Sequence, residues 1–195
     1  MRDDFSIINI LDMLDTIGED TLKEILSNFS CPKNKEIEYF VRNTALGFAK
    51  SKISVTHLVM DENGELAAIF TITHKPVEIV NNGLSGEMRK KLGRYAQLNE
   101  ETNSYLVSAF LIAQFGKNAV SRTGRPLSGD ELMDNTLQVL KLIQRDVGGG
   151  IVFLECEDTP KLLGFYTSEH NKFRKFGTRM SEVDNTQYIQ LLRFF

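Results

Sequence analysis

The sequence predicts a mixed α/β (α+β) domain, in which helices flank a central, mostly antiparallel sheet that contains one parallel strand–helix–strand crossover. Two pairs of strands, at 55–73 and 173–195, have the pattern of hairpins. Between them, the nearly continuous apolar run Tyr105–Phe115 predicts a strand that is buried on both faces. A capped helix and a second apolar strand, Ile151–Glu155, follow it, and this order implies a right-handed parallel crossover.

Length and composition are those of one globular domain. The chain has 195 residues, of which 42% are apolar and 25% charged, and this balance excludes disordered and coiled-coil chains. The net charge of −3 does not favour nucleic acid as a partner of the whole surface. The two cysteines have no paired spacing, which is typical of a reducing, cytoplasmic compartment. We expect no contact with a membrane, because no apolar run approaches ~20 residues, and the first residues lack the form of a signal peptide.

Helices are predicted before the first hairpin. One apolar face follows the helical spacing i, i+3, i+4, i+7 over Leu22–Phe29, and Cys31-Pro32 then interrupts the chain. A second helix is predicted from Lys35 to about Ala49. The first hairpin has strands at 55–60 and 66–73, joined at Asn63-Gly64, which is a strong signal for a tight turn.

Residues 76–103 have the character of an insertion. They include Asn81-Asn82-Gly83 and a polar, helix-like stretch over 86–98. The stretch carries a basic cluster, Arg89, Lys90, Lys91 and Arg94. One interpretation of the cluster is a solvated helix face; the other is a rim that meets an anionic partner.

Two helix starts in the second half of the chain carry clear capping signals. Ser128 and Glu131 have the spacing of a capping box, and the helix they begin is predicted to end at the glycines 148–150. Thr159 followed by Pro160 predicts an N-cap and a first-turn proline for a short helix. The strands 173–180 and 187–195 are expected to close the sheet as a hairpin.

The loop before Ser128 has features that suit a phosphate. A helix N-terminus offers unpaired N–H groups and the positive end of the helix dipole, and Arg122 and Arg125 add charge. Gly124–Gly129 has the glycine spacing of a P-loop, but Asp130 and Glu131 stand where such a loop needs lysine and a hydroxyl. The dinucleotide fingerprint is absent. A CoA-type pyrophosphate remains compatible, and so does an ordinary crossover loop.

At this point the sequence resembles the GNAT superfamily of acyl-CoA-dependent N-acetyltransferases. In the acyl-CoA signature of that family, the last glycine of the loop and the following pair match Gly129–Met133, and the strand end Leu111–Asn118 resembles the segment that bonds the pantetheine arm. The resemblance covers residues 34–195, with 76–103 as an insertion, and leaves residues 1–33 as an N-terminal helical extension.

A second GNAT signature resembles the segment Thr159–Tyr166, in which Tyr166 falls on the tyrosine of the family. Two positions depart from the pattern. Leu127 stands at the middle glycine of the phosphate loop, and Thr159 stands at the usual asparagine.

The resemblance implies acetyl-CoA as a cosubstrate. It implies a backbone N–H near Phe115 that polarises the thioester carbonyl and Tyr166 as the acid that protonates the leaving sulfur. A buried core tyrosine is the structural alternative for Tyr166. A base is also required, and among the carboxylates at the end of the strand, Glu155 is the candidate, with Glu157 and Asp158 beside it. The residues implied to bind acetyl-CoA are Gln114, Phe115, Gly116, Lys117, Arg122, Gly124, Arg125, Leu127, Ser128, Gly129, Asp130 and Thr159.

Other chemistries find less support in the sequence. Cys156 lies beside carboxylates and without a neighbouring histidine, so we expect a buried, inert thiol. The histidines His57, His74 and His170 are scattered, and no spacing of metal ligands occurs, so we expect no metal.

The predicted function is transfer of an acetyl group from acetyl-CoA to a primary amine by direct attack on the thioester. The sequence does not determine the acceptor, which is a small molecule, a protein or a charged tRNA. The acidic net charge argues against tRNA, and the basic cluster argues for it. The alternative is a catalytically weak CoA- or protein-binding regulatory module on the same fold. The apolar tail, residues 191–195, makes a homodimer possible.

Overall fold

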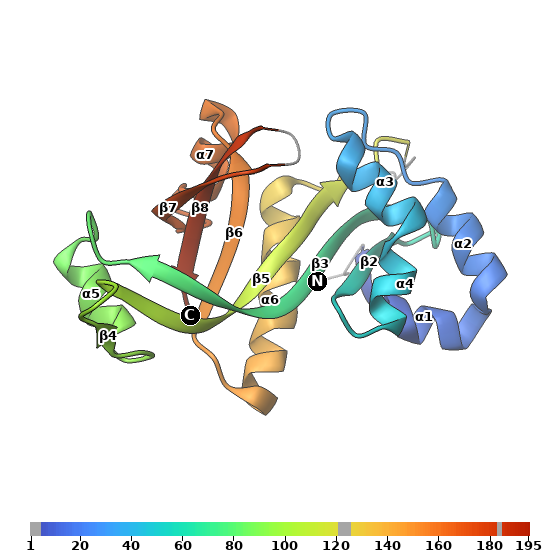
Figure 1. Ribbon diagram of the computed structural model, residues 1–195. Coiled ribbons are helices and arrows are strands. Elements are labelled where there is room, and N and C mark those ends of the chain that lie inside the picture. The colour runs from blue at the N-terminus through green and yellow to red at the C-terminus, as the bar shows by residue number, and fades with distance from the viewer. Residues whose placement is uncertain (1–4, 121–125, 183–184) are drawn as a thin grey trace. The chain divides into compact units, whose positions relative to one another are not determined.

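The computed structural model describes residues 5–120, 126–182 and 185–195 (Figure 1). The described strands are hydrogen-bonded in the order β1-β2-β3-β5-β6-β8-β7, with β4 paired to β5. The chain divides into two compact units. The first holds the residues up to Thr73 together with Ile112–Gln138, and the second holds His74–Leu111 and Val139–Phe195. Two long strands, β3 (Leu66–Val80) and β5 (Ser104–Lys117), contribute residues to both units.

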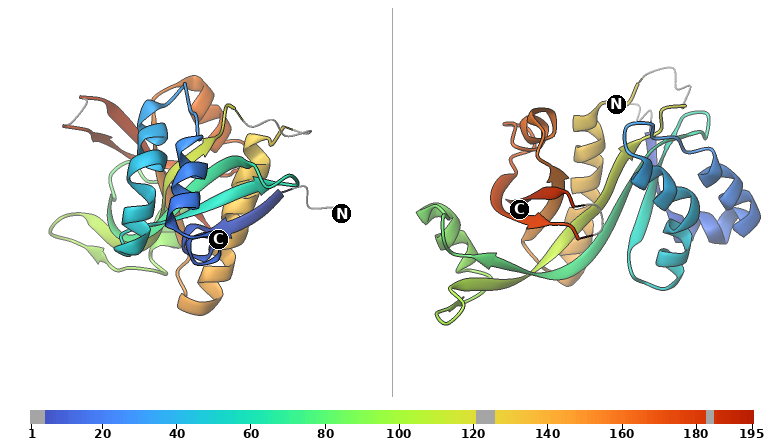
Figure 2. Two further views of the ribbon diagram at one scale, coloured as in Figure 1. Left: turned by 90° about the vertical axis from the view of Figure 1, so that its right-hand side faces the viewer. Right: turned by 45° about the horizontal axis from the view of Figure 1, so that its top comes forward.

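The first unit begins with a strand and four helices. In chain order these are β1 (Phe5–Asn9), α1 (Ile10–Ile17), α2 (Glu19–Ser27), α3 (Lys35–Asn43) and α4 (Ala45–Lys50), and β2 (Val55–Asp61) follows them. The strand β2 pairs antiparallel with both β1 and β3. Figure 2 shows the helices, in blue to cyan, gathered beside these strands in both views.

The core of the first unit forms where the helices meet β2 and β3. Leu22, Leu26 and Phe29 are fully or almost fully buried there, together with Leu58 and Ile69 from the strands. The helix predicted over 22–29 is confirmed as far as Ser27, where α2 ends, and Phe29 is buried in the same core from beyond the helix.

The second unit contains the crossover and the closing hairpin. Its remaining elements are α5 (Gly86–Leu92), β4 (Leu98–Asn99), the end of α6 (Gly129–Val147), β6 (Ile151–Glu157), α7 (Pro160–Tyr166), β7 (Arg174–Met180) and β8 (Gln187–Phe194). Its core packs Ile79, Leu92, Val107 and Ile151 together.

The predicted parallel crossover is confirmed within the second unit. Phe110 of β5 pairs in parallel with Val152 of β6, and β6 pairs antiparallel with β8. The glycines that end α6 make this return to the sheet possible. Gly149 has a positive φ of 94°, and a Cβ there would lie 3.0 Å from the ring of Phe110. A Cβ on Gly150 would clash with the hydroxyl of Tyr95. Only glycine therefore fits both positions without a rearrangement.

Three predicted helix and strand boundaries were wrong. The helix expected over 35–49 is two helices, because Thr44 leaves the helical backbone at φ −120° and ψ −37°. The helix expected over 86–98 ends at Leu92, followed by Gly93 as its C-cap. The hairpin strand expected to end at Thr73 continues to Val80, so residues 76–80 are strand.

The prediction that the strand at 105–115 is buried on both faces was also wrong. The strand exists, but Leu106 is 68% exposed and Ser108 is exposed too. In this part of β5 one face is covered and the other is open, so burial alternates along the strand. In the apolar C-terminal tail, Leu191 and Leu192 are fully buried in β8, whereas Phe195 is 38% exposed. No helix among the described residues is long and apolar enough to cross a membrane.

Candidate active site

The start of α6 has the capping box that the sequence predicts. The Ser128 N–H donates to Glu131 Oε2 at 2.8 Å, and the Glu131 N–H donates to Ser128 Oγ at 3.1 Å. These two bonds use two of the N–H groups at the helix start. The box stands at the positive end of the dipole of a 19-residue helix. Such an end attracts a phosphate.

Lys117 joins the end of β5 to the loop before α6. Its ammonium donates to the carbonyl oxygen of Leu127 at 3.0 Å. Leu127 itself is only 5% exposed, so its side chain anchors the loop in the core where the GNAT pattern has a glycine. The lysine therefore places a positive charge beside the first turn of α6.

The neighbouring candidates on β5 lie in the same unit. Gln114 and Phe115 are half-buried, and Gly116 is buried against Ile37. A Cβ on Gly116 would lie 3.2 Å from Ile37 Cγ2, so glycine lets the strand approach α3 closely. The remaining loop candidates, Arg122, Gly124 and Arg125, lie outside the described residues.

Tyr166 occupies the last turn of α7 in the second unit. The residue is 8% exposed and its ring meets Phe165 and Phe173 edge to face. Burial raises the pKa of its hydroxyl well above the usual value, and the nearby Cys156 raises it further. The phenol therefore keeps its proton at neutral pH, as a hydrogen-bond donor to a developing thiolate must.

Thr159 begins α7 in the way the sequence predicts. Its side chain accepts from the Leu162 N–H at 3.4 Å, and Pro160 fills the first turn. The hydroxyl of Thr159 therefore has a capping role in this structure.

Glu155 lies on β6 and joins three strands. Its Oε2 accepts from Arg179 Nε of β7, and its Oε1 accepts from Gln190 Nε2 of β8, both at 2.8 Å. This geometry gives Glu155 a structural role, and its role as a base stays a prediction. Glu157 is exposed at the end of the same strand, and so is Asp158 after it.

Cys156 is buried between these carboxylates. Burial, followed by the charges of Asp158 and Glu157, raises the pKa of its thiol to about 11. The thiol is therefore protonated at neutral pH, as an inert thiol would be. Among the described residues, no three His, Cys, Asp or Glu side chains gather as metal ligands would.

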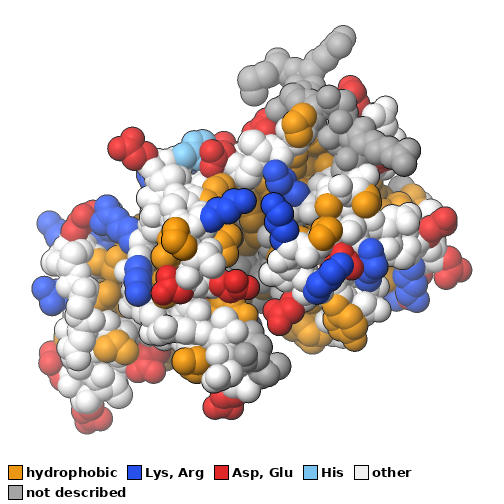
Figure 3. All heavy atoms as spheres, turned by 90° about the horizontal axis from the view of Figure 1, so that it is seen from above, with side chains coloured by type: hydrophobic (Ala, Val, Ile, Leu, Met, Phe, Trp, Pro, Cys, Tyr) orange, Lys and Arg blue, Asp and Glu red, His pale blue; other side chains and the backbone are white. Residues whose placement is uncertain are grey.

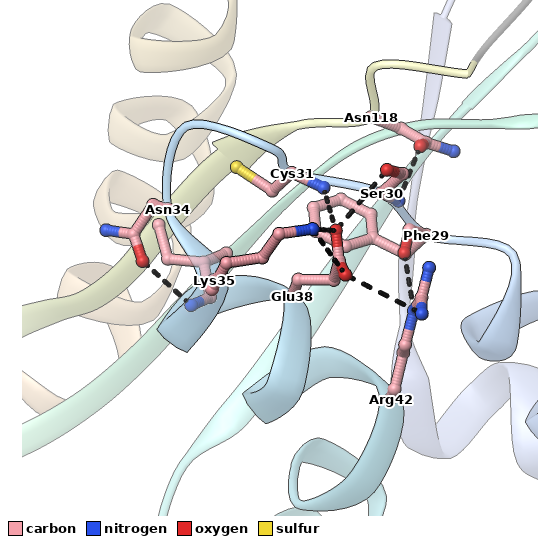
Figure 4. A network of polar contacts seen from close by, with 9 residues as sticks. Phe29, Ser30, Cys31, Asn34, Lys35, Glu38, Arg42 and Asn118 are labelled. Carbon is pink, nitrogen blue, oxygen red and sulfur yellow. Dashed lines mark hydrogen bonds and ion pairs between the residues drawn. The ribbon is translucent and has the colours of Figure 1, made fainter.

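The sequence did not reveal a polar network in the first unit (Figure 4). Glu38 of α3 accepts from the Cys31 N–H at 2.8 Å and from Lys35 Nζ at 3.0 Å. These two contacts, led by the Cys31 N–H, lower the pKa of Glu38. Arg42, one turn further along α3, donates from Nε to the Phe29 carbonyl at 2.7 Å. The carboxylate and the guanidinium thus fix the loop between α2 and α3.

Asn118 ties this loop to the end of β5. Its Oδ1 accepts from the Ser30 N–H at 2.9 Å, and its Nδ2 donates to the Leu66 carbonyl at 2.8 Å. A cavity of about 610 Å³ opens beside these contacts, with Arg42 and Glu65 among its lining residues. The bonds of Asn118 span 88 and 52 residues, and no local sequence signal predicts them.

No protein-family model matches the chain, and no curated protein matches it. Solved structures do. AtaT complexed with acetyl-methionyl-tRNAfMet superposes with a TM-score of 0.64 at 15% identity, over 98% of this chain and 94% of AtaT. A tyrosine-to-phenylalanine mutant of KacT gives a TM-score of 0.65 at 14% identity, over 98% of this chain and 95% of KacT. AtaTR bound with AcCoA gives 0.59 at 16% identity, over 98% and 94% of the two chains.

These likenesses confirm the fold that the sequence predicts. The chain has the GNAT fold, with its mostly antiparallel sheet, one parallel pair and flanking helices.

Proposed function

We propose that this protein is an acetyl-CoA-dependent N-acetyltransferase whose acceptor is the amino group of an aminoacyl-tRNA. The observation that carries the proposal is the match of 98% of the chain to AtaT, which was solved with acetyl-methionyl-tRNAfMet. The AcCoA in the AtaTR structure supports the same cosubstrate. The acidic net charge argued against tRNA, but a net charge says little about a local surface.

The start of α6 supports a role in binding the pyrophosphate of acetyl-CoA. The helix dipole and the ammonium of Lys117 both favour a negative charge at this place. The side chain of Leu127 does not compete for the ligand, because it is buried in the core.

The reaction needs one bond to form and one to break. The neutral amine attacks the thioester carbonyl carbon, a C–N bond forms, and the C–S bond breaks with its electron pair on sulfur. The nitrogen loses a proton and the sulfur gains one. Holding the two substrates together supplies a large part of such a rate.

Tyr166 serves the leaving sulfur in this proposal. Its buried phenol has a pKa above that of a thiol, so it stabilises the thiolate by donating a hydrogen bond. A donor that meets charge as it develops acts on the transition state more than on the bound substrate.

The test measures release of the CoA thiol with aminoacyl-tRNA and with uncharged tRNA. We expect release only with the charged tRNA, and we expect Tyr166→Phe to lower kcat by ~10-fold or more. Tyr105→Phe is the matched control, because Tyr105 is a second buried tyrosine of the same unit and has no proposed role.

Equal rates for the Tyr166→Phe variant and the wild type would remove the tyrosine from the mechanism. Binding of acetyl-CoA without thiol release on any amine would instead favour the regulatory module.

A further inference from the structure

A second cavity lies in the second unit and gathers positive charge. Its volume is about 730 Å³. Four of its lining residues are basic and one is acidic, Glu169. This excess runs against the net charge of −3 of the whole chain. We call the four basic residues the basic pocket: Lys91, Lys172, Arg174 and Arg193.

Aromatic rings lie among these charges. Lys91 Nζ sits 5.5 Å from the centre of the Phe194 ring, and Phe194 stacks on Tyr95 with an angle of 24° between the rings. Phe173 and Phe194 both line the cavity. Phe173 is only 2% exposed, so Phe194 is the aromatic side chain that can meet a nucleic-acid base beside these cations.

The basic surface continues along α5. Arg89, Lys90 and Arg94 are exposed on or just after this helix. In Figure 3, several Lys and Arg side chains lie at the left of the view, on the side where Figure 1 draws α5, with Asp and Glu side chains among them. Lys91 therefore belongs both to the basic cluster noted in the sequence and to the basic pocket.

Glu87 holds two members of the basic pocket. Its Oε1 lies 2.9 Å from Lys91 Nζ, and its Oε2 accepts from Arg174 Nη1 at 2.9 Å. These two cations, Arg174 first, lower the pKa of Glu87 to about 2. All three side chains are at least one-third exposed, and exposed ion pairs of this kind contribute little to stability. A phosphate can therefore replace the carboxylate as the partner of both cations.

We propose that the basic pocket binds the phosphodiester backbone of the RNA acceptor. The inference rests on the proposed function, because it assigns a surface to the acceptor named there. The tRNA is expected to release counterions when its phosphates meet these four cations, so its affinity must fall with salt.

The experiment titrates fluorescently labelled, uncharged tRNA with the full chain and follows anisotropy at several salt concentrations. Lys172→Gln and Arg174→Gln are each expected to weaken binding and to lower the slope of log K against log salt by about 1. Lys52→Gln is the matched control. Lys52 and Lys172 are both exposed lysines with positive φ, 59° and 58°, but Lys52 belongs to the first unit.

Glu87→Gln provides a test in the opposite direction. The variant removes the carboxylate that competes with phosphate, so tRNA should bind more tightly, by about 2-fold or more. A merely damaged fold would weaken binding instead.

Unchanged affinity and salt slope in Lys172→Gln and Arg174→Gln would overturn the inference, and so would wild-type protein that does not bind tRNA at low salt. Acetyl-CoA binding and thiol release, measured on the same variants, separate the two proposals. If charged tRNA is acetylated but the variants bind it normally, the proposed role of the basic pocket is wrong and the proposed enzymatic function is supported.

Discussion

His57 shows how a single buried residue ties stability to pH. Its ring stacks on Phe70 at 4.9 Å between centres, and burial lowers its pKa to about 4 from 6.5. Between these values the unfolded chain binds a proton that the folded chain does not. The free energy of unfolding should therefore fall as pH drops from 6.5 to 4, by at most about 1.4 kcal/mol per pH unit.

The measurement is urea unfolding at several pH values, compared between wild type and His57→Phe. The unfolding free energy of the wild type minus that of the variant should fall as pH falls, because only the wild type has the histidine that titrates. A difference for His57→Phe that does not change with pH would contradict the assignment.

Local signals predicted individual residues well, and distant contacts escaped them. The caps at Ser128 and Thr159 are confirmed because a cap bonds residues three positions away. Glu155 was chosen for its place at a strand end, yet its partners Arg179 and Gln190 lie 24 and 35 residues further along the chain. Only the register of three strands brings them together, and no spacing in the sequence reveals it.

At the scale of elements, variants at the start of α6 distinguish the effect of a helix cap on stability from an effect on acetyl-CoA binding. Ser128→Ala removes the N-cap and should cost about 1 kcal/mol of unfolding free energy. It should also weaken the binding of acetyl-CoA, because the first turn of α6 is the proposed phosphate site. Ser85→Ala is the matched control, since Ser85 caps α5 by accepting from the Met88 N–H.

Denaturant unfolding and titration with acetyl-CoA check this pair. Both variants should lose similar stability, and only Ser128→Ala should lose affinity. Equal affinity for acetyl-CoA in the two variants would move the phosphate site away from α6.

Sequence patterns did not predict elements where short strands and helices follow one another directly. The strand β1 has five residues and runs straight into α1, whose cap is Asn9. The signal for α1 was present, since Ile10, Met13, Leu14 and Ile17 have helical spacing. The extension of β3 was hidden by Pro76, which usually ends a strand but here is exposed within it.

At the scale of the whole molecule, the N-terminal residues are part of the first core. Leu22, Leu26 and Phe29 pack there with residues of β2 and β3. The division into an extension over 1–33 and a domain over 34–195 remains a proposal. A chain that starts at residue 34 should lose these side chains from the core and should unfold at much lower denaturant than the full chain, or fail to fold. Cooperative unfolding at the same midpoint would show that the extension is independent.

The fold was predictable from the order of its hairpin turns, helix caps and apolar runs, because each of these is a local signal in the sequence. The acceptor was not, because the surface that we propose for it, the basic pocket, draws its members from residues 91 to 193. A net charge of −3 gave no sign that cations converge there.

Mass spectrometry of the amino acid released from tRNA tests the proposed function most directly. Aminoacyl-tRNA is incubated with the full chain and isotope-labelled acetyl-CoA, and mild base then frees the amino acid. The account predicts that the amino acid carries one labelled acetyl group on its α-nitrogen. Free amino acid without label, in a sample where the protein binds acetyl-CoA, would contradict it.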